Sequence, residues 1–168
     1  MSVDNSATTA TDKHHISGAA EISAAAQELL SCARHRLEIF APRFELNAFH
    51  DHSATEILNH FATRNQRNRG QFIITDEIWF MRFNSRIVDL CRRLSSFYEV
   101  RKLAADYPSE EEFFIVIDRE SVFHQPELAK PVAITSVGDR GYARRFTRKF
   151  ERYWDASESL QELFTLGL

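Results

Sequence analysis

The chain has 168 residues, 43% of them hydrophobic and 27% charged, which fits one globular domain with its own core. Its formal net charge of −3 excludes a globally basic protein, so any site for nucleic acid or another polyanion must be local. The sequence shows no secretory signal and no apolar stretch near the roughly 18 residues of a spanning helix. We therefore expect a soluble, cytoplasmic protein with no membrane partner.

The first half of the chain predicts a tail followed by alternating helices and strands. Residues 1–18 are polar and predict a disordered tail before a domain at 19–168. Apolar residues recur at helical spacing over 19–34, and residues 36–41 alternate like a strand that Pro42 ends. Ser53 is the expected cap of a second helix, after which 71–75 form a second strand. The two cysteines, Cys32 and Cys91, lie in helical patterns and are expected to be buried free thiols.

The second half predicts one long helix, a strand cluster and a final helix. Residues 77–95 fit one continuous amphipathic helix, and 97–103 a strand. Residues 113–118 (FFIVID) are almost wholly apolar, which is typical of a central strand covered on both faces, and 121–124 pair back on it as a hairpin. Residues 134–137 form a short strand or a loop. Helices follow at 139–155 and 158–163. This order predicts an α/β fold, with a mixed, mostly central sheet flanked by helices on both faces.

At the FFIVID strand the chain begins to resemble one half-unit of the phospholipase D superfamily. The likeness spans about residues 20–155 and rests on the element order, the hairpin after FFIVID and the ending FERYW of the last long helix. Within that superfamily, the RRLS segment at 92–95 and the F-x-x-x-W ending at 150–154 resemble most an uncharacterised group of phospholipase D-like domains from proteobacteria, which are bacterial. Because a single half-unit usually needs a second to complete its cleft, the resemblance implies a homodimer or an unknown protein partner.

The catalytic motif of that superfamily is His-x-Lys, four further residues, then Asp. With Asp118 in the Asp position, Glu111 stands at the His position and Phe113 at the Lys position. A carboxylate repels a phosphodiester and a phenyl ring cannot neutralise its charge, so the alignment predicts a pseudoenzyme with no catalytic residues and no cofactor. The positions of the Gly-Ser and Asn that follow the motif fall near Gln125, Pro126 and Leu128.

The last long helix carries the strongest surface signal. Its cations cover one arc and its aromatic residues the opposite arc, so the cations either form a solvated face or contact phosphates or an acidic partner. The anion-binding candidates on this helix are Arg144, Arg145, Arg148, Lys149 and Arg152.

Three further sets of residues are candidates for binding. Arg82, Arg86 and Arg93 form a stripe on the helix predicted at 77–95, which is an anion-binding site or a set of local ion pairs with Asp89. The candidates for a cleft are Asp76, Asp118 and His124. His50, Asp51, His52 and His60 offer imidazoles and a carboxylate, but their spacing gives no complete metal site, so we expect none.

These observations leave three functional hypotheses. The first is a non-catalytic phospholipase D-like binding or regulatory module. The second is a nucleic-acid-binding protein that uses the basic C-terminal helix. The third is a degenerate phosphodiesterase, which requires Asp118 and His124 to converge in one pocket.

Overall fold

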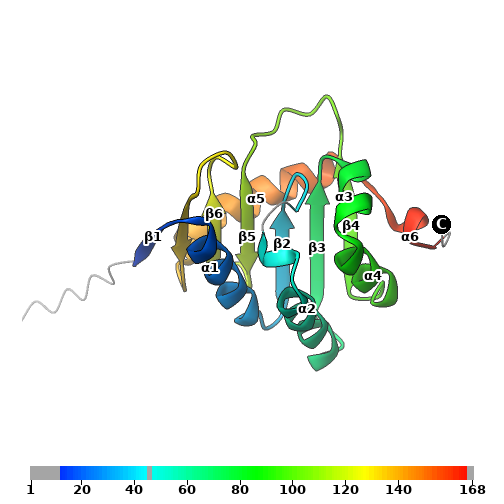
Figure 1. Ribbon diagram of the computed structural model, residues 1–168, viewed down its shortest axis with the longest axis horizontal. Coiled ribbons are helices and arrows are strands. Elements are labelled where there is room, and N and C mark those ends of the chain that lie inside the picture. Colours follow the sequence, from blue (N-terminus) through cyan, green and yellow to red (C-terminus); the bar gives the residue numbers. More distant parts are fainter. Residues whose placement is uncertain (1–11, 45–46, 166–168) are drawn as a thin grey trace, which may run out of the picture.

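The computed structural model describes residues 12–44 and 47–165 (Figure 1). Within these ranges the elements in chain order are β1 (Lys13–Ser17), α1 (Ala19–Ser31), β2 (Arg36–Phe40), the 3-10 helix η1 (Asn47–Phe49), α2 (His52–Arg64), β3 (Arg69–Ile74), α3 (Glu77–Phe83), α4 (Ser85–Arg93), β4 (Tyr98–Leu103), β5 (Phe113–Ile117), β6 (Ser121–Gln125), β7 (Val132–Ser136), α5 (Arg140–Asp155), β8 (Ser157–Ser159) and α6 (Gln161–Thr165).

The strands form one mixed sheet in the order β1-β7-β6-β5-β2-β3-β4-β8. Strands β2, β3 and β4 are parallel, as expected for strands joined through helices, and every other pairing is antiparallel. Figure 1 shows α1 and α2 in front of the sheet and α5 behind it. The predicted α/β class, with a mixed sheet and helices on both faces, is confirmed.

Phenylalanine rings fill the core on both faces of the sheet. On the face covered by α1 and α2, the ring of Phe44 contacts those of Phe49, Phe72 and Phe80 at centroid distances of 4.9–5.5 Å. On the α5 face, rings from the central strands meet rings from α5, as in the 5.5 Å contact of Phe114 with Phe146. These rings need no polar partner, and FFIVI (Phe113–Ile117) is buried along its whole length in β5. Asp118 follows β5 and is half-buried.

Part of the segment predicted as a disordered tail, residues 1–18, forms a strand. Lys13–Ser17 form β1, which pairs with β7 at one edge of the sheet, and residues 1–11 lie outside the described ranges. Four of the five residues of β1 are exposed, so its pattern is as polar as that of a tail. What holds the strand is hydrogen bonding to β7, which a polar sequence can supply as well as an apolar one.

The helix predicted at 77–95 is two helices, α3 and α4, that break at Asn84. The buried amide of Asn84 donates a hydrogen bond of 2.9 Å to the carbonyl oxygen of Arg43, and its backbone leaves the helical region at φ −116° and ψ 41°. The break changes the exposure of the predicted apolar arc. Phe80 and Ile87 are buried, whereas Phe83 is 51% exposed.

Three smaller differences concern caps, an added strand and a thiol. Asp51, rather than Ser53, caps α2 by accepting a 3.1 Å hydrogen bond from the amide of Ala54. Ser157–Ser159 form a strand, β8, before the last short helix. Cys32 is exposed, and Cys91 is a buried free thiol whose pKa burial raises. Among the described residues, no helix is long and apolar enough to cross a membrane.

Candidate functional site

Helix α5 is anchored to the sheet through one face. It begins at Asp139, whose carboxylate accepts a 2.9 Å hydrogen bond from the amide of Tyr142. Its buried residues recur every three or four positions and pack against the side chains of β2, β3, β5 and β6 that point away from α1 and α2. The residues that α5 buries in this contact are Ala143, Phe146, Phe150 and Tyr153.

The opposite face of α5 carries a row of arginines, which we call the arginine ridge: Arg144, Arg148 and Arg152. All three are exposed, and no side-chain hydrogen bond or ion pair joins them to another residue in the described ranges. They are spaced four residues apart, so they follow one another at about 6 Å along the helix axis. The ridge is a line of cations available to an external anion.

The other two predicted cations of α5 have partners. The guanidinium of Arg145 lies 5.7 Å from the ring centroid of Phe146. The ammonium of Lys149 is largely buried and lies 2.6 Å from a carboxylate oxygen of Glu112. Lys149 is therefore part of the protein's internal charge balance and is not a surface cation.

Glu112 is the centre of a buried polar cluster with Lys149 and His124. One carboxylate oxygen faces Lys149, and the other lies 2.8 Å from Nε2 of His124. Burial by itself raises the pKa of Glu112, but hydrogen bonds from His124 and Lys149 outweigh it and hold that pKa below its ordinary value. The sequence analysis missed this residue. A signal was present, because alternation along the strand places Glu112 on the same face as Phe114, toward α5.

Asp118, at the other end of β5, has a structural role. Its carboxylate accepts hydrogen bonds of 2.8–3.0 Å from the backbone amides of Arg34, His35 and Arg36. It occupies the left-handed region at φ 52°, which Asp tolerates better than most residues. Asp118 thus fastens the β5–β6 turn to the loop that enters β2.

The third hypothesis required Asp118 and His124 to converge in one pocket, and the structure places them apart. In the β5–β6 register Ile117 faces Ser121 and Phe114 faces His124, so the two candidates lie at opposite ends of the hairpin. The degenerate-phosphodiesterase hypothesis therefore loses the geometry it required. The third cleft candidate, Asp76, caps α3 and pairs with Arg43 at 3.4 Å.

A groove with acidic walls lies at the end of the β5–β6 hairpin where the motif alignment places the family's nucleophile. It has a volume of about 460 Å³. Its walls carry three carboxylates, those of Glu110, Glu111 and Glu127. An approaching phosphodiester would meet negative charge here. The residues that line it are Glu110, Glu111, Pro126, Glu127, Leu128 and Ala129.

The arginine stripe predicted on one helix is divided between α3 and α4. Arg82 lies on α3, 5.4 Å from the ring centroid of its neighbour Phe83. Asp89 pairs with Arg92 at 3.8 Å, and no ion pair joins it to Arg86 or Arg93 in the part of the chain that the structure describes. Arg93 instead lines a groove of about 430 Å³ together with residues of α2.

The histidines considered for a metal site have other contacts. The ring of His50 packs edge-on against that of Trp79 at 6.3 Å, and His52 pairs with Glu56 at 3.1 Å. Asp51 caps α2, as described above, and its pKa is lowered chiefly by a hydrogen bond from Gln27. Within residues 12–44 and 47–165, no three His, Cys, Asp or Glu side chains are grouped closely enough to hold a metal ion.

Comparison with known proteins gives a family and a fold. The family model described as "Domain of unknown function (DUF7931)" matches residues 18–166. No curated protein matches significantly. The chain is similar to Nuc from Salmonella typhimurium, a phospholipase D family member (10% identity, TM-score 0.66, covering 89% of this chain and 99% of that one). It is also similar to NucT from Helicobacter pylori (12% identity, TM-score 0.65, covering 89% of this chain and 99% of that one).

A further structural neighbour belongs to a different kind of protein. TrmBL2, an archaeal chromatin protein described as showing a novel mode of DNA binding, is 18% identical with a TM-score of 0.65. The match covers 91% of this chain but 56% of TrmBL2, so the chain spans little more than half the length of that protein. At these identities the likenesses establish the fold that phospholipase D family members share.

Proposed function

The chain belongs to the DUF7931 family, and we propose that it is a non-catalytic, phospholipase D-like module that binds the phosphate backbone of nucleic acid through the arginine ridge of α5. The observation that carries this proposal is the row of three exposed arginines without partners on the outer face of a helix that aromatic residues fix to the sheet.

The form of the ridge suits a phosphate backbone. The helix that carries the arginines is already ordered, so contact with successive phosphates restricts only the arginine side chains. Each contact also releases counterions from the nucleic acid. The net charge of −3 provides no general attraction for a polyanion, so binding depends on local groups of cations such as the ridge. The DNA-binding mode ascribed to TrmBL2 supports the idea that this fold is compatible with binding nucleic acid without cleaving it.

Two features support binding rather than cleavage. The aligned motif positions hold Glu111 and Phe113, and Phe113 is buried in the core. The groove beside Glu111 is lined by carboxylates, which disfavour a phosphodiester there. Binding on α5, on the helix-covered back of the sheet, does not require that groove.

The test is a salt titration of duplex binding. The affinity of the purified protein for a fluorescent 20-base-pair duplex is measured by anisotropy at several KCl concentrations. Three phosphate contacts contribute a slope of about −2.7 to log K against log salt. We expect the triple variant R144E/R148E/R152E to lose most of this slope and at least about tenfold in affinity at low salt.

A matched control separates the ridge from a general change in charge. The triple variant R67E/R92E/K130E changes the net charge equally but places the substitutions on exposed cations away from α5. If both variants weaken binding to the same extent, the attraction is not located on α5 and the proposal fails. It also fails if the wild-type protein binds duplex with no dependence on salt.

A further inference from the structure

A second surface, on the other face of the sheet, combines a half-buried tryptophan and an exposed phenylalanine with cations. It lies between η1 and α2 on one side and α3 and α4 on the other, and we call it the α2–α4 seam. It comprises His50, His52, Thr55, Glu56, Asn59, Trp79, Arg82, Phe83, Arg86 and Arg93. Because α2 and α4 contribute to the core cluster on the face opposite α5, the seam is separate from the arginine ridge.

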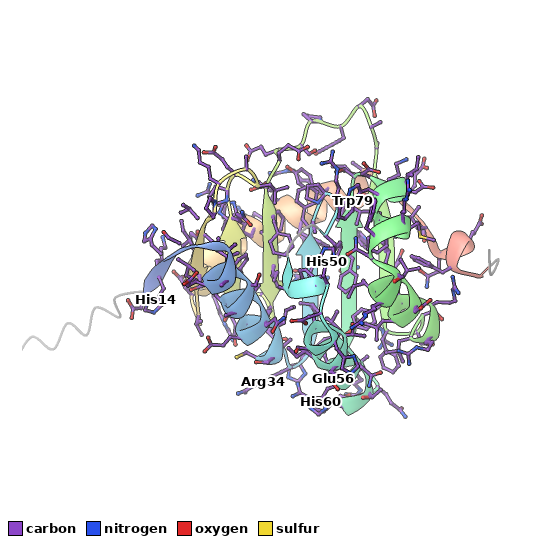
Figure 2. The ribbon with its side chains drawn as sticks, viewed as in Figure 1. His14, Arg34, His50, Glu56, His60 and Trp79 are labelled. Carbon is purple, nitrogen blue, oxygen red and sulfur yellow. The ribbon has the colours of Figure 1, made fainter. Side chains whose placement is uncertain are left out.

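One end of the seam is aromatic. The rings of Trp79 and Phe83 lie 4.8 Å apart, and the guanidinium of Arg82 lies 5.4 Å from the Phe83 ring centroid. Phe83 is 51% exposed and the neighbouring Ile78 is 79% exposed, which is unusual for such large apolar side chains. Figure 2 shows Trp79 on α3, with His50 nearby on the segment that leads into α2. The break at Asn84 is what brings Phe83 to the surface.

The rest of the seam is a polar groove with cations along one wall. Arg86 is close enough to Asp51 to lower the pKa of that carboxyl, though it forms no ion pair with any described residue. Arg93 lies seven residues further along α4 and lines the groove of about 430 Å³. The facing wall, from α2, offers hydrogen-bonding side chains: those of His52, Thr55 and Asn59. The groove-lining carboxylate of Glu56 is paired with His52, and that of Asp51, near Arg86, accepts hydrogen bonds from Gln27 and the amide of Ala54.

We propose that the α2–α4 seam binds a short single-stranded segment of nucleic acid, with bases stacked on Trp79 and Phe83 and phosphates held by Arg86 and Arg93. From Trp79 to Arg93 the helices rise about 20 Å, which leaves room for a few nucleotides. Aromatic rings that reach the surface beside a cationic groove are the combination that recognises unpaired bases, because stacking uses the face of the base and the groove follows the backbone. Phe83 is exposed and Trp79 is half-buried.

The choice of a single strand follows from the rings. In a duplex the faces of the bases are covered by their neighbours, so Trp79 and Phe83 could not reach them. An acidic protein segment would satisfy Arg86 and Arg93 but would not need planar partners for the rings. The presence or absence of bases on the probe therefore distinguishes the two kinds of partner.

The experiment compares a fluorescent oligothymidylate of 12 nucleotides with an abasic oligodeoxyribose phosphate of the same length. We expect the full-length protein to bind the base-bearing strand more tightly. The variant W79A/F83A should lose about tenfold or more for oligothymidylate and little for the abasic strand, since stacking on one ring is usually worth that much. The variant R86E/R93E should weaken binding to both strands and to a similar degree.

Conservative replacement of the tryptophan gives a second readout. The variant W79F keeps a ring for stacking, so its affinity should stay within about twofold of wild type. Stacking of a base on Trp79 quenches indole fluorescence, and W79F should lose this quenching on titration with oligothymidylate. The W79A/F83A protein is compared with wild type by circular dichroism and urea unfolding, and R86E/R93E tests the seam without touching a packed side chain.

Equal affinities for base-bearing and abasic strands, or unchanged affinity in W79A/F83A, would overturn the proposal. The ridge variant R144E/R148E/R152E is measured with the same oligonucleotides. Because its seam is unchanged, it should bind oligothymidylate almost as tightly as the wild-type protein. If seam variants fail to respond while the ridge variant loses duplex binding, only this inference is refuted. If the ridge variant has no effect but W79A/F83A loses the preference for bases, the seam is supported and the ridge is not.

Discussion

The pKa values of two glutamates buried under α5 are shifted in opposite directions. Burial raises the pKa of Glu38 despite the nearby Arg36 and Arg119, so its charge reduces stability once the pH exceeds the ordinary pKa of a glutamate. Glu112 is held in its charged form by His124 and Lys149, and its pKa is lowered. The difference lies in the hydrogen bonds. Both oxygens of Glu112 have partners, whereas Oε2 of Glu38 has none among the described residues.

We expect Glu112→Gln to destabilise the protein at neutral pH by about 3 kcal/mol, because it leaves Lys149 without its closest counter-charge. A group with a lowered folded-state pKa contributes stability that is present above its ordinary pKa and is lost as the pH falls through the lowered value. The difference in the free energy of unfolding between wild type and E112Q should therefore shrink between about pH 5 and pH 3. Urea unfolding followed by circular dichroism over that range measures it.

Glu110 provides the control for this measurement. It lies 3.7 Å from the same ammonium group, but its side chain is 73% exposed. Glu110→Gln should change stability by less than about 0.5 kcal/mol, as is usual for surface pairs. Equal effects of the two substitutions, or a difference for E112Q that does not depend on pH, would show that the buried cluster is not the source of the stability.

At the scale of elements, the pairing of β3 with β4 depends on the absence of a side chain at Gly70. Gly70 faces Tyr98 in the register of these two strands, and a methyl group at this position would overlap the Tyr98 ring. The hydroxyl of Tyr98 in turn donates a hydrogen bond to the carbonyl oxygen of Leu58, which ties β4 to α2. Packing within the sheet therefore requires glycine at position 70.

We expect Gly70→Ala to destabilise the protein by about 2 kcal/mol, the usual cost of overpacking a buried site. The same substitution in a Tyr98→Leu background should cost clearly less, because the ring that the methyl group displaces is gone. Thermal unfolding of the four proteins in this cycle tests the expectation. A cost that is the same in both backgrounds would place the effect of G70A in the backbone rather than in the contact with Tyr98.

The arrangement of α3 and α4 also belongs to this scale. The apolar periodicity of 77–95 is genuine, since Phe80, Ile87 and Leu90 are buried as one helix would predict. What periodicity could not show is the hydrogen bond from Asn84 to Arg43, 41 residues away in sequence. That contact ends one helix and starts the next, and so exposes Phe83.

At the scale of the whole molecule, the residues proposed for a cleft do not share one site. Asp118 and His124 lie at opposite ends of the β5–β6 hairpin, and Lys149 is engaged by Glu112. The arginine ridge lies on the outer face of α5, away from the carboxylate-lined groove at the hairpin end. His124 and Lys149 meet instead in the buried cluster around Glu112, which lies at the end of the hairpin opposite Asp118.

We accordingly expect no cleavage of a fluorescent, quencher-labelled single strand or of bis(p-nitrophenyl) phosphate above the rate in buffer. The assay uses the same preparation whose duplex binding has been measured, so that an inactive result comes from a folded protein. His124→Gln, purified in parallel, reports contaminating nuclease. Turnover by the wild-type protein that disappears in H124Q would contradict a purely binding role.

The sequence by itself determined the features that depend on local pattern. The apolar run FFIVID placed the central strand at 113–118, which the structure has at Phe113–Ile117, and helical periodicity placed the amphipathic α5. Burial of one or both faces of an element determines which of its positions are apolar, so the pattern can be recognised within the segment itself. The resemblance to one half of a phospholipase D enzyme was visible for the same reason, since it rested on the order of these elements.

Only the tertiary structure decided which polar residues are paired. Lys149 and Arg148 are neighbours on the same helix, yet one meets Glu112 and the other meets solvent. Likewise β1 is a strand because β7 provides an edge, and Phe83 is exposed because Asn84 reaches Arg43. Each of these outcomes depends on a partner 37 or more residues away in the sequence. The periodicity of a segment reflects which of its faces are buried, and it does not identify such a distant partner.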